Sequence, residues 1–339
     1  MLTEISVLMP VRNAVSTVTR AVQSIEAQSC KNWELIVVDD GSTDGTWTVL
    51  TGLAARNKRI RLCGRDFAGM APALNAGLKH CRCKYVARMD ADDASLPERL
   101  SLQHAFLEQH AEVGMVATRV AYGGDRAQQG GYSRYVNWSN ALVDEEAIAL
   151  NRFVESPFVH PSVMFRRSLI DTLGAYSTKN EPEDYELWLR WYAHGVRMLK
   201  LEQVLYLWND PPQRLSRVSA HYSTEAFARC KAPYLARWLR QTQANQRALY
   251  VWGAGRVTRK RVKWLIESGL EIQGYVDVAA KKIGQTIGGA RVIAPIELPP
   301  PGDVFVLSYV GSWGAGSKVK GFLVNQLGYM EGVDFLMVA

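Results

Sequence analysis

The sequence has no apolar run long enough to cross a membrane. Its longest clean apolar stretches, such as Ile5 to Met9, have the length of a buried strand. A membrane-spanning helix would need roughly 18 or more apolar residues in a row. The N-terminus also lacks a basic segment followed by an apolar one, which is the pattern of a secretory signal. We therefore expect a soluble cytoplasmic protein, or one in peripheral contact with an anionic membrane at its cytoplasmic face.

Cysteine is scarce as well. The chain has five cysteines, an odd number at scattered positions: Cys30, Cys63, Cys81, Cys83 and Cys230. This usage fits reduced thiols better than a disulfide framework. The pair Cys81-Arg-Cys83 has no second ligand pair at zinc spacing, which favours two ordinary small side chains over a zinc site.

Composition places the chain among ordinary globular proteins. Apolar residues make up 47% and charged residues 22%, which excludes a disordered chain and a fibrous repeat. A length of 339 residues predicts two domains, each able to bury its own core. The formal charge of +7 and the pI near 9.1 favour an anionic partner. Charge alone does not choose between a nucleotide phosphate, an anionic lipid surface and a nucleic acid.

The first half alternates short β-branched runs with longer amphipathic segments, which is the βαβ pattern. Pro10 should stop the first strand, and Ser42 or Thr43 could cap the helix after the second. Residues 121–140, rich in Gly, Tyr and polar side chains, predict a long irregular loop. The expected strands are 5–9, 33–38, 60–63 and 85–89, and the expected helices are 16–28 and 71–80. In the helix 16–28, one face carries Val18, Ala21, Val22 and Ile25.

A basic helical pattern leads into a second βαβ segment. Residues 219–246 interleave arginines and lysines with aromatic side chains, which favours a linker helix with a solvated charged face over a membrane-surface contact. After Arg247 the expected strands are 248–252, 271–276 and 304–308, with a helix through Ile266 after the first. A separate C-terminal domain is therefore expected.

Acidic residues gather where two of the expected strands end. Asp90-Ala-Asp92-Asp93 follows the strand 85–89, and its carboxylates repel one another unless a cation or hydrogen-bond donors compensate. A divalent ion that bridges a diphosphate would do so, because hard oxygen ligands suit Mg²⁺ or Mn²⁺. A solvated turn with a capping aspartate is an equal alternative. Asp39 and Asp40 also end a strand, at the sheet edge where ligands bind in open α/β folds.

A third acidic cluster, Glu181-Pro-Glu183-Asp184, opens a helix that continues through Trp188 and Arg190. The helix dipole alone explains acids in a first turn. The functional alternative is a general base, for which Asp184 within hydrogen-bond reach of an acceptor hydroxyl is sufficient. Arg190 could hold a phosphate or pair with Glu186 at i, i+4.

Six short segments follow one another over about the first 215 residues. They are Pro10-Val-Arg12-Asn13, Val37-Val-Asp39-Asp40-Gly-Ser-Thr-Asp44-Gly-Thr46, Ala73-Leu-Asn75-Ala-Gly77-Leu, Ala87-Arg-Met-Asp90-Ala-Asp92-Asp93, His160-Pro-Ser-Val-Met-Phe-Arg166 and Glu183-Asp184-Tyr-Glu-Leu-Trp188-Leu-Arg190. Each is common alone, but their order and spacing together closely resemble the family 2 glycosyltransferases with the GT-A fold.

The resemblance implies an inverting transfer of a sugar from a nucleotide-diphosphate donor, most often a UDP-sugar in this family. The acceptor would be a hydroxyl of a surface glycan, a polysaccharide or a lipid-linked sugar, and the cofactor Mn²⁺ or Mg²⁺. Asp92 matches the metal ligand of the family's DxD element, and Asp184 matches its base. The donor-nucleotide site would comprise Pro10, Val11, Arg12, Asn13, Asp39, Asp40, Asn75, Asp90 and Ala91. The acceptor or phosphate side would comprise His160, Glu183, Trp188 and Arg190, although His160 and Trp188 also have credible packing roles.

The chemistry agrees with these roles. Direct displacement at the anomeric carbon needs a base on the acceptor side and charge stabilisation on the leaving diphosphate, and a cation supplies the latter without a proton donor. One departure concerns the residue before Asn75, which is Leu74 where many family members carry an arginine. Arg65 or Lys79 could then supply the cation that approaches the diphosphate.

We therefore expect an α/β protein in three parts. Residues 1–218 should form the GT-A domain, a mixed and mainly parallel sheet flanked by helices. Residues 219–247 should form the basic helical linker, and 248–339 a smaller Rossmann-like domain. Val251-Trp-Gly253-Ala-Gly255-Arg and Gly274-Tyr-Val-Asp277 resemble the domain at the front of some sugar acyltransferases. Thr258 stands where a dinucleotide fingerprint has its third glycine, so a ligand site and a structural or oligomerising module both stay open.

Two other classes of function compete with an enzyme. The chain could be a catalytically inactive regulator whose Rossmann-like part senses a nucleotide, but the complete set of Asp39, Asp92 and Asp184 counts against it. A nucleic-acid binder would need a basic groove with stacking aromatics, which only residues 229–247 suggest. We expect no nucleic-acid partner, and oligomeric state is not readable from the sequence.

Overall fold

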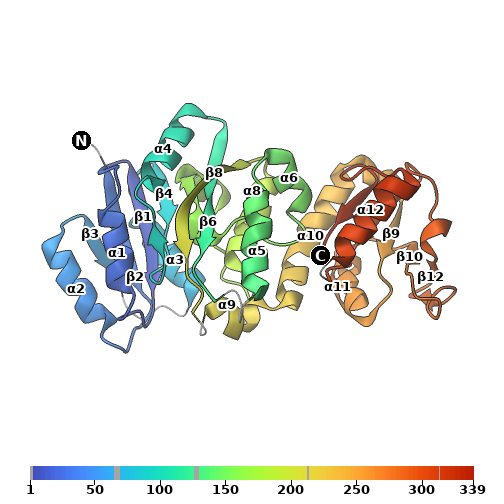
Figure 1. Ribbon diagram of the computed structural model, residues 1–339, viewed down its shortest axis with the longest axis horizontal. Helices are drawn as coiled ribbons and strands as arrows, with labels where there is room; N and C mark the ends of the chain where they lie inside the picture. The colour runs from blue at the N-terminus through green and yellow to red at the C-terminus, as the bar shows by residue number, and fades with distance from the viewer. Residues whose placement is uncertain (1–2, 65–68, 126–129, 212–213, 313) are drawn as a thin grey trace. The chain divides into compact units, whose positions relative to one another are not determined.

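The structure is a computed structural model that describes residues 3–64, 69–125, 130–211, 214–312 and 314–339. The chain forms two compact units. The first contains residues 1–145 and 157–219, and the second contains residues 146–156 and 220–339. Each unit has its own sheet (Figure 1).

The described part of the first unit builds an eight-stranded mixed sheet in the order β3-β2-β1-β4-β7-β6-β8-β5. The four strands from β3 to β4 are parallel, and β7 is antiparallel to both β4 and β6. The strands are β1 Ile5–Val11, β2 Trp33–Asp39, β3 Ile60–Cys63, β4 Tyr85–Arg88, β5 Ala94–Ser95, β6 Val113–Tyr122, β7 Met164–Arg166 and β8 Arg197–Trp208. This is the mixed, helix-flanked sheet expected from the sequence.

Helices cover both faces of this sheet. The buried face of α1, formed by the four predicted side chains, packs with the odd-numbered residues of β1. Helix α3 lies on the opposite face, where Gly77 meets Leu8 and Val38. The helices are α1 Val18–Glu26, α2 Thr46–Arg56, α3 Met70–Leu78, α4 Arg99–Gln109, α5 Gly130–Ala141, α6 Glu145–Asn151, α7 Ser168–Leu173, α8 Glu183–Ala193 and α9 Leu215–Val218.

The predicted end of the first strand and the predicted cap of the helix after the second strand were both wrong. Strand β1 continues through Pro10 to Val11, because β4 pairs only as far as Leu8 and leaves β2 as the sole strand neighbour there. A proline is tolerated where its missing N–H has no ladder partner to lose. Helix α2 starts after Gly45, which has a left-handed φ of 87°, so neither Ser42 nor Thr43 caps it.

The predicted loop 121–140 was also wrong. Strand β6 runs to Tyr122, and α5 occupies Gly130–Ala141; residues 126–129 lie outside the described residues. Tyr132 and Tyr135 of α5 contact the Trp208 ring at centroid distances of 5.6 and 6.0 Å. Aromatic packing against β8 therefore fixes a helix whose local sequence has low helix propensity.

Close packing of α3 on the sheet gives a test of this core. A Cβ on Gly77 would lie 2.3 Å from Leu8 Cδ1 and 2.7 Å from Val38 Cγ2, and both neighbours are fully buried. We expect Gly77→Ala to lower the free energy of unfolding by about 1–3 kcal/mol through overpacking, as measured by urea denaturation.

The matched control is Gly52→Ala in α2, where an added Cβ meets nothing within 4 Å. It should raise stability by about 0.5–1 kcal/mol, because alanine loses less backbone entropy in a helix. Equal effects of the two substitutions would contradict the packing described for α3.

The second unit is a doubly wound parallel sheet with an antiparallel edge strand, in the order β11-β12-β10-β9-β13-β14. The order reverses between β9 and β13, as in Rossmann-like folds. The strands are β9 Ala248–Trp252, β10 Gly274–Val276, β11 Thr286–Ile287, β12 Ala290–Ile293, β13 Val304–Ser308 and β14 Phe335–Met337. The helices are α10 Thr224–Gln241, α11 Arg256–Glu267 and α12 Ala315–Leu327.

The basic helix is not a free-standing linker. Trp238 of α10 packs edge-on against Phe305 of β13, with ring centroids 5.9 Å apart, and the Lys231 ammonium is buried against the carbonyls of Phe153 and Val338. The helix therefore belongs to the second unit, together with residues 146–156. Arg247 also pairs with Asp334 at 2.9 Å, so two of the basic residues are held by partners within this unit.

No helix in the described parts of the chain is both long and apolar enough to span a bilayer. The five cysteines all lie in the described part of the chain, and none forms a disulfide there.

Candidate active site

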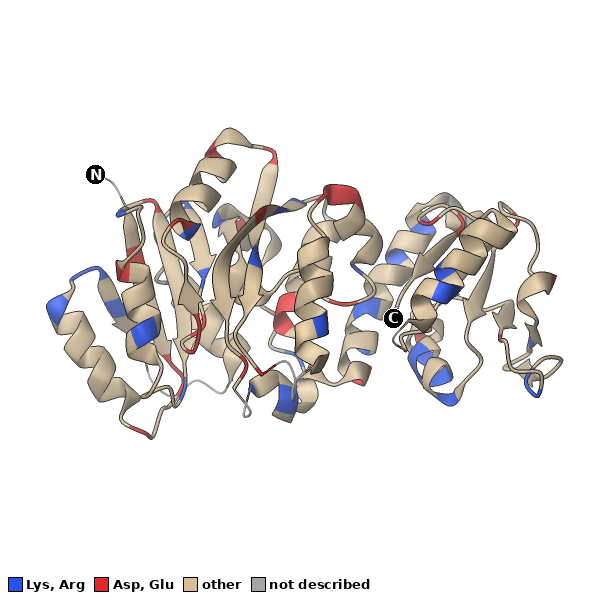
Figure 2. Cartoon of the chain, viewed as in Figure 1, with Lys and Arg blue, Asp and Glu red and all other residues tan. Residues whose placement is uncertain are grey.

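The candidate site lies at the carboxyl ends of the parallel strands of the first unit. Strands β1, β2 and β4 all end at this edge, which Figure 2 shows at the lower end of the sheet, where acidic residues gather on the loops. Open α/β sheets bind ligands at this edge. The structure therefore brings the first two acidic clusters of the sequence to one side of the sheet.

The loop after β1 is tied to the loop after β2. The Asn13 backbone N–H donates to Ser42 Oγ at 2.9 Å, and the Asn13 side-chain oxygen accepts from the Thr43 N–H at 2.8 Å. Asn13 has a positive φ of 49°, which asparagine tolerates better than most residues. Pro10 and Val11 are buried in β1, so they shape the backbone here rather than present side chains.

Two adjacent aspartates end β2 in different environments. Asp39 is fully buried, and its Oδ1 accepts from Ser42 Oγ at 2.5 Å. Asp40 accepts from the Gly69 N–H at 3.3 Å and lies 3.8 Å from Arg12, whose side chain is 63% exposed. Burial raises the pKa of Asp40, while Gly69 and Arg12 oppose the shift. Both carboxylates are therefore positioned by their surroundings, and Arg12 stays open to solvent.

The second, fourth and fifth residues after β4 bring their carboxylates into one cluster. One oxygen from each of Asp90, Asp92 and Asp93 lies within 4.8 Å of the others. Asp93 is fully buried and accepts from the Tyr206 hydroxyl at 2.9 Å and from the Asn209 N–H at 2.7 Å. Ala91 is buried between the first two acids. Hydrogen-bond donors thus hold Asp93 in place, and Asp92 is held through its backbone carbonyl, which accepts from Asn209 Nδ2.

The electrostatics of this cluster favour a bound cation. The pKa of Asp92 is raised to about 6, first by burial and then by the neighbouring Asp90 carboxylate. Burial also raises the pKa of Asp93 well above its usual range, and Asp90 and Asp92 add to that shift. A divalent cation relieves this repulsion, and carboxylate oxygens are the ligands that Mg²⁺ and Mn²⁺ prefer. Asp92 and Asp90 therefore offer the kind of ligand that such a cation prefers.

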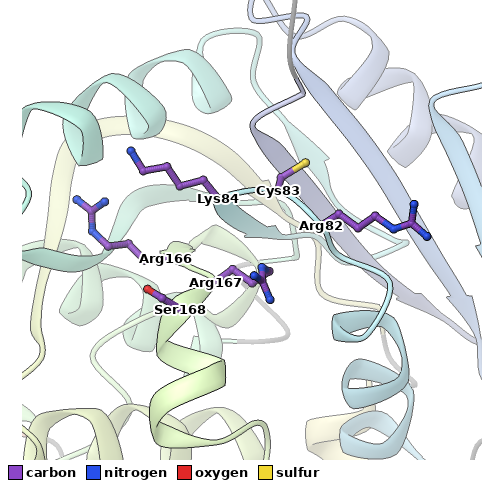
Figure 3. A pocket seen from close by; sticks show the side chains of 6 residues that line it. All are labelled: Arg82, Cys83, Lys84, Arg166, Arg167 and Ser168. Atoms are coloured by element: carbon purple, nitrogen blue, oxygen red, sulfur yellow. The ribbon is translucent and has the colours of Figure 1, made fainter.

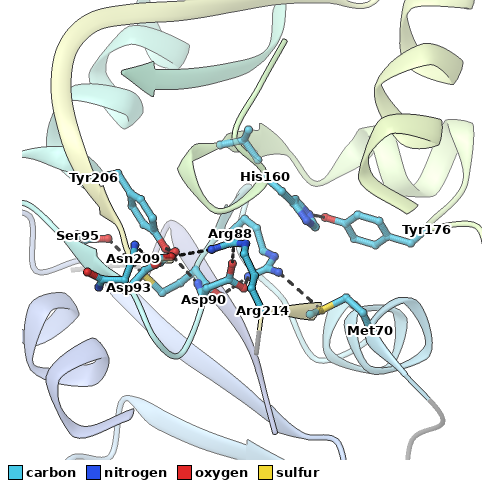
Figure 4. A network of polar contacts seen from close by, with 12 residues as sticks. Met70, Arg88, Asp90, Asp93, Ser95, His160, Tyr176, Tyr206, Asn209 and Arg214 are labelled. Carbon is cyan, nitrogen blue, oxygen red and sulfur yellow. Dashed lines mark hydrogen bonds and ion pairs between the residues drawn. The ribbon is translucent and has the colours of Figure 1, made fainter. Parts of the chain in front are cut away.

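Two arginines flank the cluster. Arg88 ends β4 with a side chain only 2% exposed, and its Nη1 donates to Asp90 Oδ1 at 2.6 Å. The Arg214 guanidinium stacks on the Trp208 ring at 3.9 Å and lies 4.0 Å from Asp90 Oδ2. Figure 4 shows both arginines beside Asp90. The acidic cluster is therefore partly neutralised on two sides.

Asp184 opens α8 at the edge of the same site. It is partly exposed, and its Oδ1 accepts the Tyr185 N–H at 2.7 Å. Burial raises its pKa to about 6, the Tyr185 N–H and the Arg88 charge oppose that shift, and the Asp90 charge adds to it. A carboxyl that titrates closer to neutrality is better matched to general-base chemistry.

His160 and Asn75 are joined through Tyr176. The His160 Nε2 lies 2.9 Å from the Tyr176 hydroxyl, while the Asn75 amide bonds both the N–H and the C=O of Tyr176 at 2.9 and 2.8 Å. Burial and the Arg88 charge lower the pKa of His160 well below its usual range, so the ring is neutral. Asn75 therefore fixes the loop that carries Tyr176, instead of presenting a free amide to the donor.

Three other predicted site residues are packed or paired within the protein. Trp188 is fully buried and packs edge-on against His160 at 5.9 Å, and Glu183 is buried in the first turn of α8. Arg190 pairs with Glu186 at 2.9 Å and donates to the carbonyls of Gly174 and Ala175. The i, i+4 alternative for Arg190 is therefore confirmed, and its donors are not available to a phosphate.

Neither cation suggested for the diphosphate is shown in the site. Arg65 lies outside the described residues. Lys79 is exposed at the C-terminal end of α3, a helix length from Met70 at its start.

A cavity of about 230 Å³ is lined by Arg82, Cys83, Lys84, Arg166, Arg167 and Ser168. Figure 3 shows it before the start of β4, so it belongs to the opposite end of the strands.

Sequence reasoning missed four residues of the site. Tyr206 and Asn209 hold Asp93, and Arg88 and Arg214 face Asp90. Only Arg88 carried a sequence signal, a lone charge inside the buried run of β4 directly before the acids. The others come from β8 and the segment after it, more than a hundred residues further along the chain.

Comparisons with known proteins identify the family of this chain. The family model described as glycosyl transferase family 2 matches residues 6–174. The putative glycosyltransferase EpsE of Bacillus subtilis is 35% identical over 227 residues, covering 66% of this chain and 78% of that protein. The amylovoran biosynthesis glycosyltransferase AmsE of Erwinia amylovora is 31% identical over 191 residues, covering 55% and 68%. The chain belongs to glycosyl transferase family 2 and is a glycosyltransferase.

Solved structures of low sequence identity share its fold. The mannosyltransferase PcManGT of Pyrobaculum calidifontis, in complex with GDP-Man and Mn²⁺, matches with a TM-score of 0.51 and 20% identity over 79% of this chain and 69% of that one. TarS 1-349 of S. aureus, in complex with UDP-GlcNAc, matches with a TM-score of 0.52 and 17% identity over 78% and 80%. These likenesses establish the GT-A fold of the chain.

Proposed function

We propose that the protein is an inverting transferase that moves a sugar from a nucleotide-diphosphate sugar, with UDP as the first candidate carrier, to an acceptor hydroxyl. The observation that carries this proposal is the position of Arg88, which pairs with Asp90 at 2.6 Å and whose charge also acts on Asp184. An acidic cluster suited to a cation and a candidate base therefore flank one small region. Displacement with inversion needs one base on the acceptor side and charge stabilisation on the other.

Each part of the donor has a candidate contact. Asp39 or Asp40 accepts hydrogen bonds from the base or the ribose, with Arg12 and Asn13 on the same loops. Asp92 and Asp90 would hold a divalent cation, which would supply positive charge to the leaving diphosphate when bound. Arg214, stacked on Trp208 and 4.0 Å from Asp90, supplies the second positive charge. The donor identity is a proposal, since neighbours of this fold carry both GDP-Man and UDP-GlcNAc.

Asp184 acts on the acceptor side. Its carboxylate accepts the proton of the acceptor hydroxyl while the oxygen attacks the anomeric carbon and the diphosphate departs from the opposite face. Neutral His160, held by Tyr176, borders the same region. We place the acceptor in surface polysaccharide synthesis, supported by the name of AmsE, and a lipid-linked acceptor would put the reaction at the cytoplasmic face of a membrane.

The direct test is release of nucleoside diphosphate from a panel of nucleotide sugars, with Mn²⁺ or with EDTA. We expect Mn²⁺-dependent release from one of them, and an α-linked donor should yield a β-linked product in the anomeric NMR signals. A product with retained configuration would contradict the inverting mechanism. Release that EDTA leaves unchanged would contradict the role given to Asp92.

The pH dependence follows from the raised pKa of Asp184. Its base form is lost as the pH falls through about 6, so kcat/KM should fall tenfold per pH unit below that value. Saturating Mn²⁺ keeps Asp92 ionised, so protonation of Asp92 does not contribute to the fall of kcat/KM at low pH. A pH profile that is flat between 5 and 8 would contradict Asp184 as the base.

A further inference from the structure

Arg88 has hydrogen-bonding capacity that the protein does not use. Its Nη1 donates to Asp90 Oδ1 at 2.6 Å and to the Met89 carbonyl. Its Nη2 reaches only the Met70 sulfur at 3.7 Å, and its buried Nε has no hydrogen-bond partner among the described residues. A thioether is a weak acceptor, and a buried donor without a partner is costly. The guanidinium therefore has two groups suited to a better acceptor.

The other fully buried arginine of this region shows what a structural role looks like. The Arg99 Nε donates to Gln103, its Nη1 to Ser95, and its Nη2 to the carbonyls of Arg88 and Val163. All three nitrogens have oxygen acceptors within the protein. In Arg88, by contrast, only Nη1, which faces Asp90, has oxygen acceptors among the described residues.

The position of Arg88 indicates which ligand would use these groups. Figure 4 shows it between the Asp90–Asp93 side of the network and the His160–Tyr176 pair, with Met70 beside its guanidinium. Its charge acts on Asp92 on one side and on Asp184 on the other. In the proposed reaction the sugar ring must lie between these two sides, because its anomeric carbon joins the leaving diphosphate to the attacking hydroxyl.

The charge balance of Arg88 also favours a sugar over a phosphate. Arg88 already forms a direct pair with Asp90, whereas Arg214 lies 4.0 Å from that carboxylate and is better placed to pair with an anion. An Arg–Asp pair offers donors and an acceptor side by side, which matches neighbouring hydroxyls of a sugar.

We propose that Arg88 binds the sugar moiety of the donor, with its Nε–H and Nη2–H donating to sugar hydroxyls that displace the Met70 sulfur. This inference rests on the proposed function and deepens it, because it names a residue that discriminates a nucleotide sugar from the bare nucleotide.

The test compares binding of matched pairs by calorimetry in Mn²⁺: UDP with UDP-glucose, GDP with GDP-mannose, and dTDP with dTDP-glucose. Arg88→Lys keeps a positive charge beside Asp90 but removes the Nε–H and Nη2–H donors. We expect it to bind the nucleoside diphosphate within about twofold of the wild type and the nucleotide sugar about tenfold more weakly. Arg99→Lys is the matched control and should weaken both ligands of a pair equally or neither.

Met70→Gln tests the same idea without changing the arginine. The glutamine oxygen would satisfy Nη2 inside the protein, so it should weaken nucleotide-sugar binding by about tenfold and spare the nucleoside diphosphate. This variant keeps the inference testable if Arg88→Lys does not fold.

The outcomes separate this inference from the proposed function. Equal weakening of both ligands by Arg88→Lys would assign Arg88 to the diphosphate or to the placement of Asp90, and would overturn the inference while sparing the proposed function. No weakening of either ligand by either variant would overturn it too. A wild type that binds no member of any pair would overturn the proposed function and this inference with it.

Discussion

Asp184→Asn should lower the rate of sugar transfer by roughly 10²–10⁴-fold, the usual contribution of a positioned general base. The asparagine keeps the shape of the side chain and can still accept from the Tyr185 N–H, which the aspartate accepts at 2.7 Å. It cannot take the proton of an acceptor hydroxyl. Because Asp184 is on the acceptor side, donor binding in Mn²⁺ should stay within about twofold of the wild type.

The control for this prediction is Glu181→Gln, a nearby acid whose Oε1 accepts from Ser177 Oγ at 2.6 Å. It should retain transfer within about twofold, since it touches neither ligand. Single-turnover rates with donor bound separate chemistry from binding. Near-normal transfer by Asp184→Asn would refute its role as the base.

Asp92→Ala should abolish the stabilisation that Mn²⁺ and donor together give the wild type. A ligand at about 100 times its dissociation constant stabilises the native state by about 2.7 kcal/mol, which raises the midpoint of a unit of this size by roughly 5–10 °C. Without Asp92 the cluster loses a carboxylate whose pKa is raised to about 6 by burial and by the neighbouring Asp90. The midpoint shift should then be near zero.

In the metal-free protein, the dependence of stability on pH gives an independent test of Asp92. A carboxyl whose folded pKa is raised contributes stability that is present at low pH and is lost as the pH rises through that pKa. For Asp92 the loss falls between its ordinary pKa of 3.8 and about 6. At pH 7.5 in EDTA, Asp92→Asn should therefore raise the unfolding free energy, by about 1 kcal/mol after allowance for solvent screening.

Asp44→Asn is the matched control for both experiments. Asp44 lies at the same sheet edge, but its Oδ1 accepts from the Thr46 hydroxyl and N–H. The variant should keep the Mn²⁺-dependent shift and lose stability in EDTA, because favourable hydrogen bonds lower the pKa of Asp44. A metal-dependent shift that survives in Asp92→Ala would contradict the ligand role.

The sequence predicted the parallel core of the first sheet because its signals are local. Buried runs such as Trp33–Asp39 and the apolar face of α1 need no knowledge of distant residues. Helix α5 was missed because Gly, Tyr, Ser and Asn are weak helix formers, and its stability comes from rings that meet Trp208 about seventy residues later. Periodicity cannot register such a contact.

The same reasoning explains the candidate site. The acids were found because strand ends and family motifs mark them, and the structure brings Asp90, Asp92 and Asp93 together. The environment of each acid was not predictable, because Tyr206 and Asn209 reach Asp93 from β8 and the segment after it. The sequence left Arg190 open between a phosphate and Glu186, and could not show its contacts with Gly174 and Ala175, which depend on how the loop after α7 returns to α8.

The most direct test of the account is thermal stability against UDP, GDP, CMP, dTDP and NAD, each with Mn²⁺ or with EDTA. A ligand that binds only the native state raises the midpoint. We predict that one nucleoside diphosphate raises it with Mn²⁺ and that EDTA removes the shift, which would fix the donor class and direct the choice of sugars. A shift with NAD alone, or with no nucleotide at all, would contradict a metal-dependent donor site in the first unit.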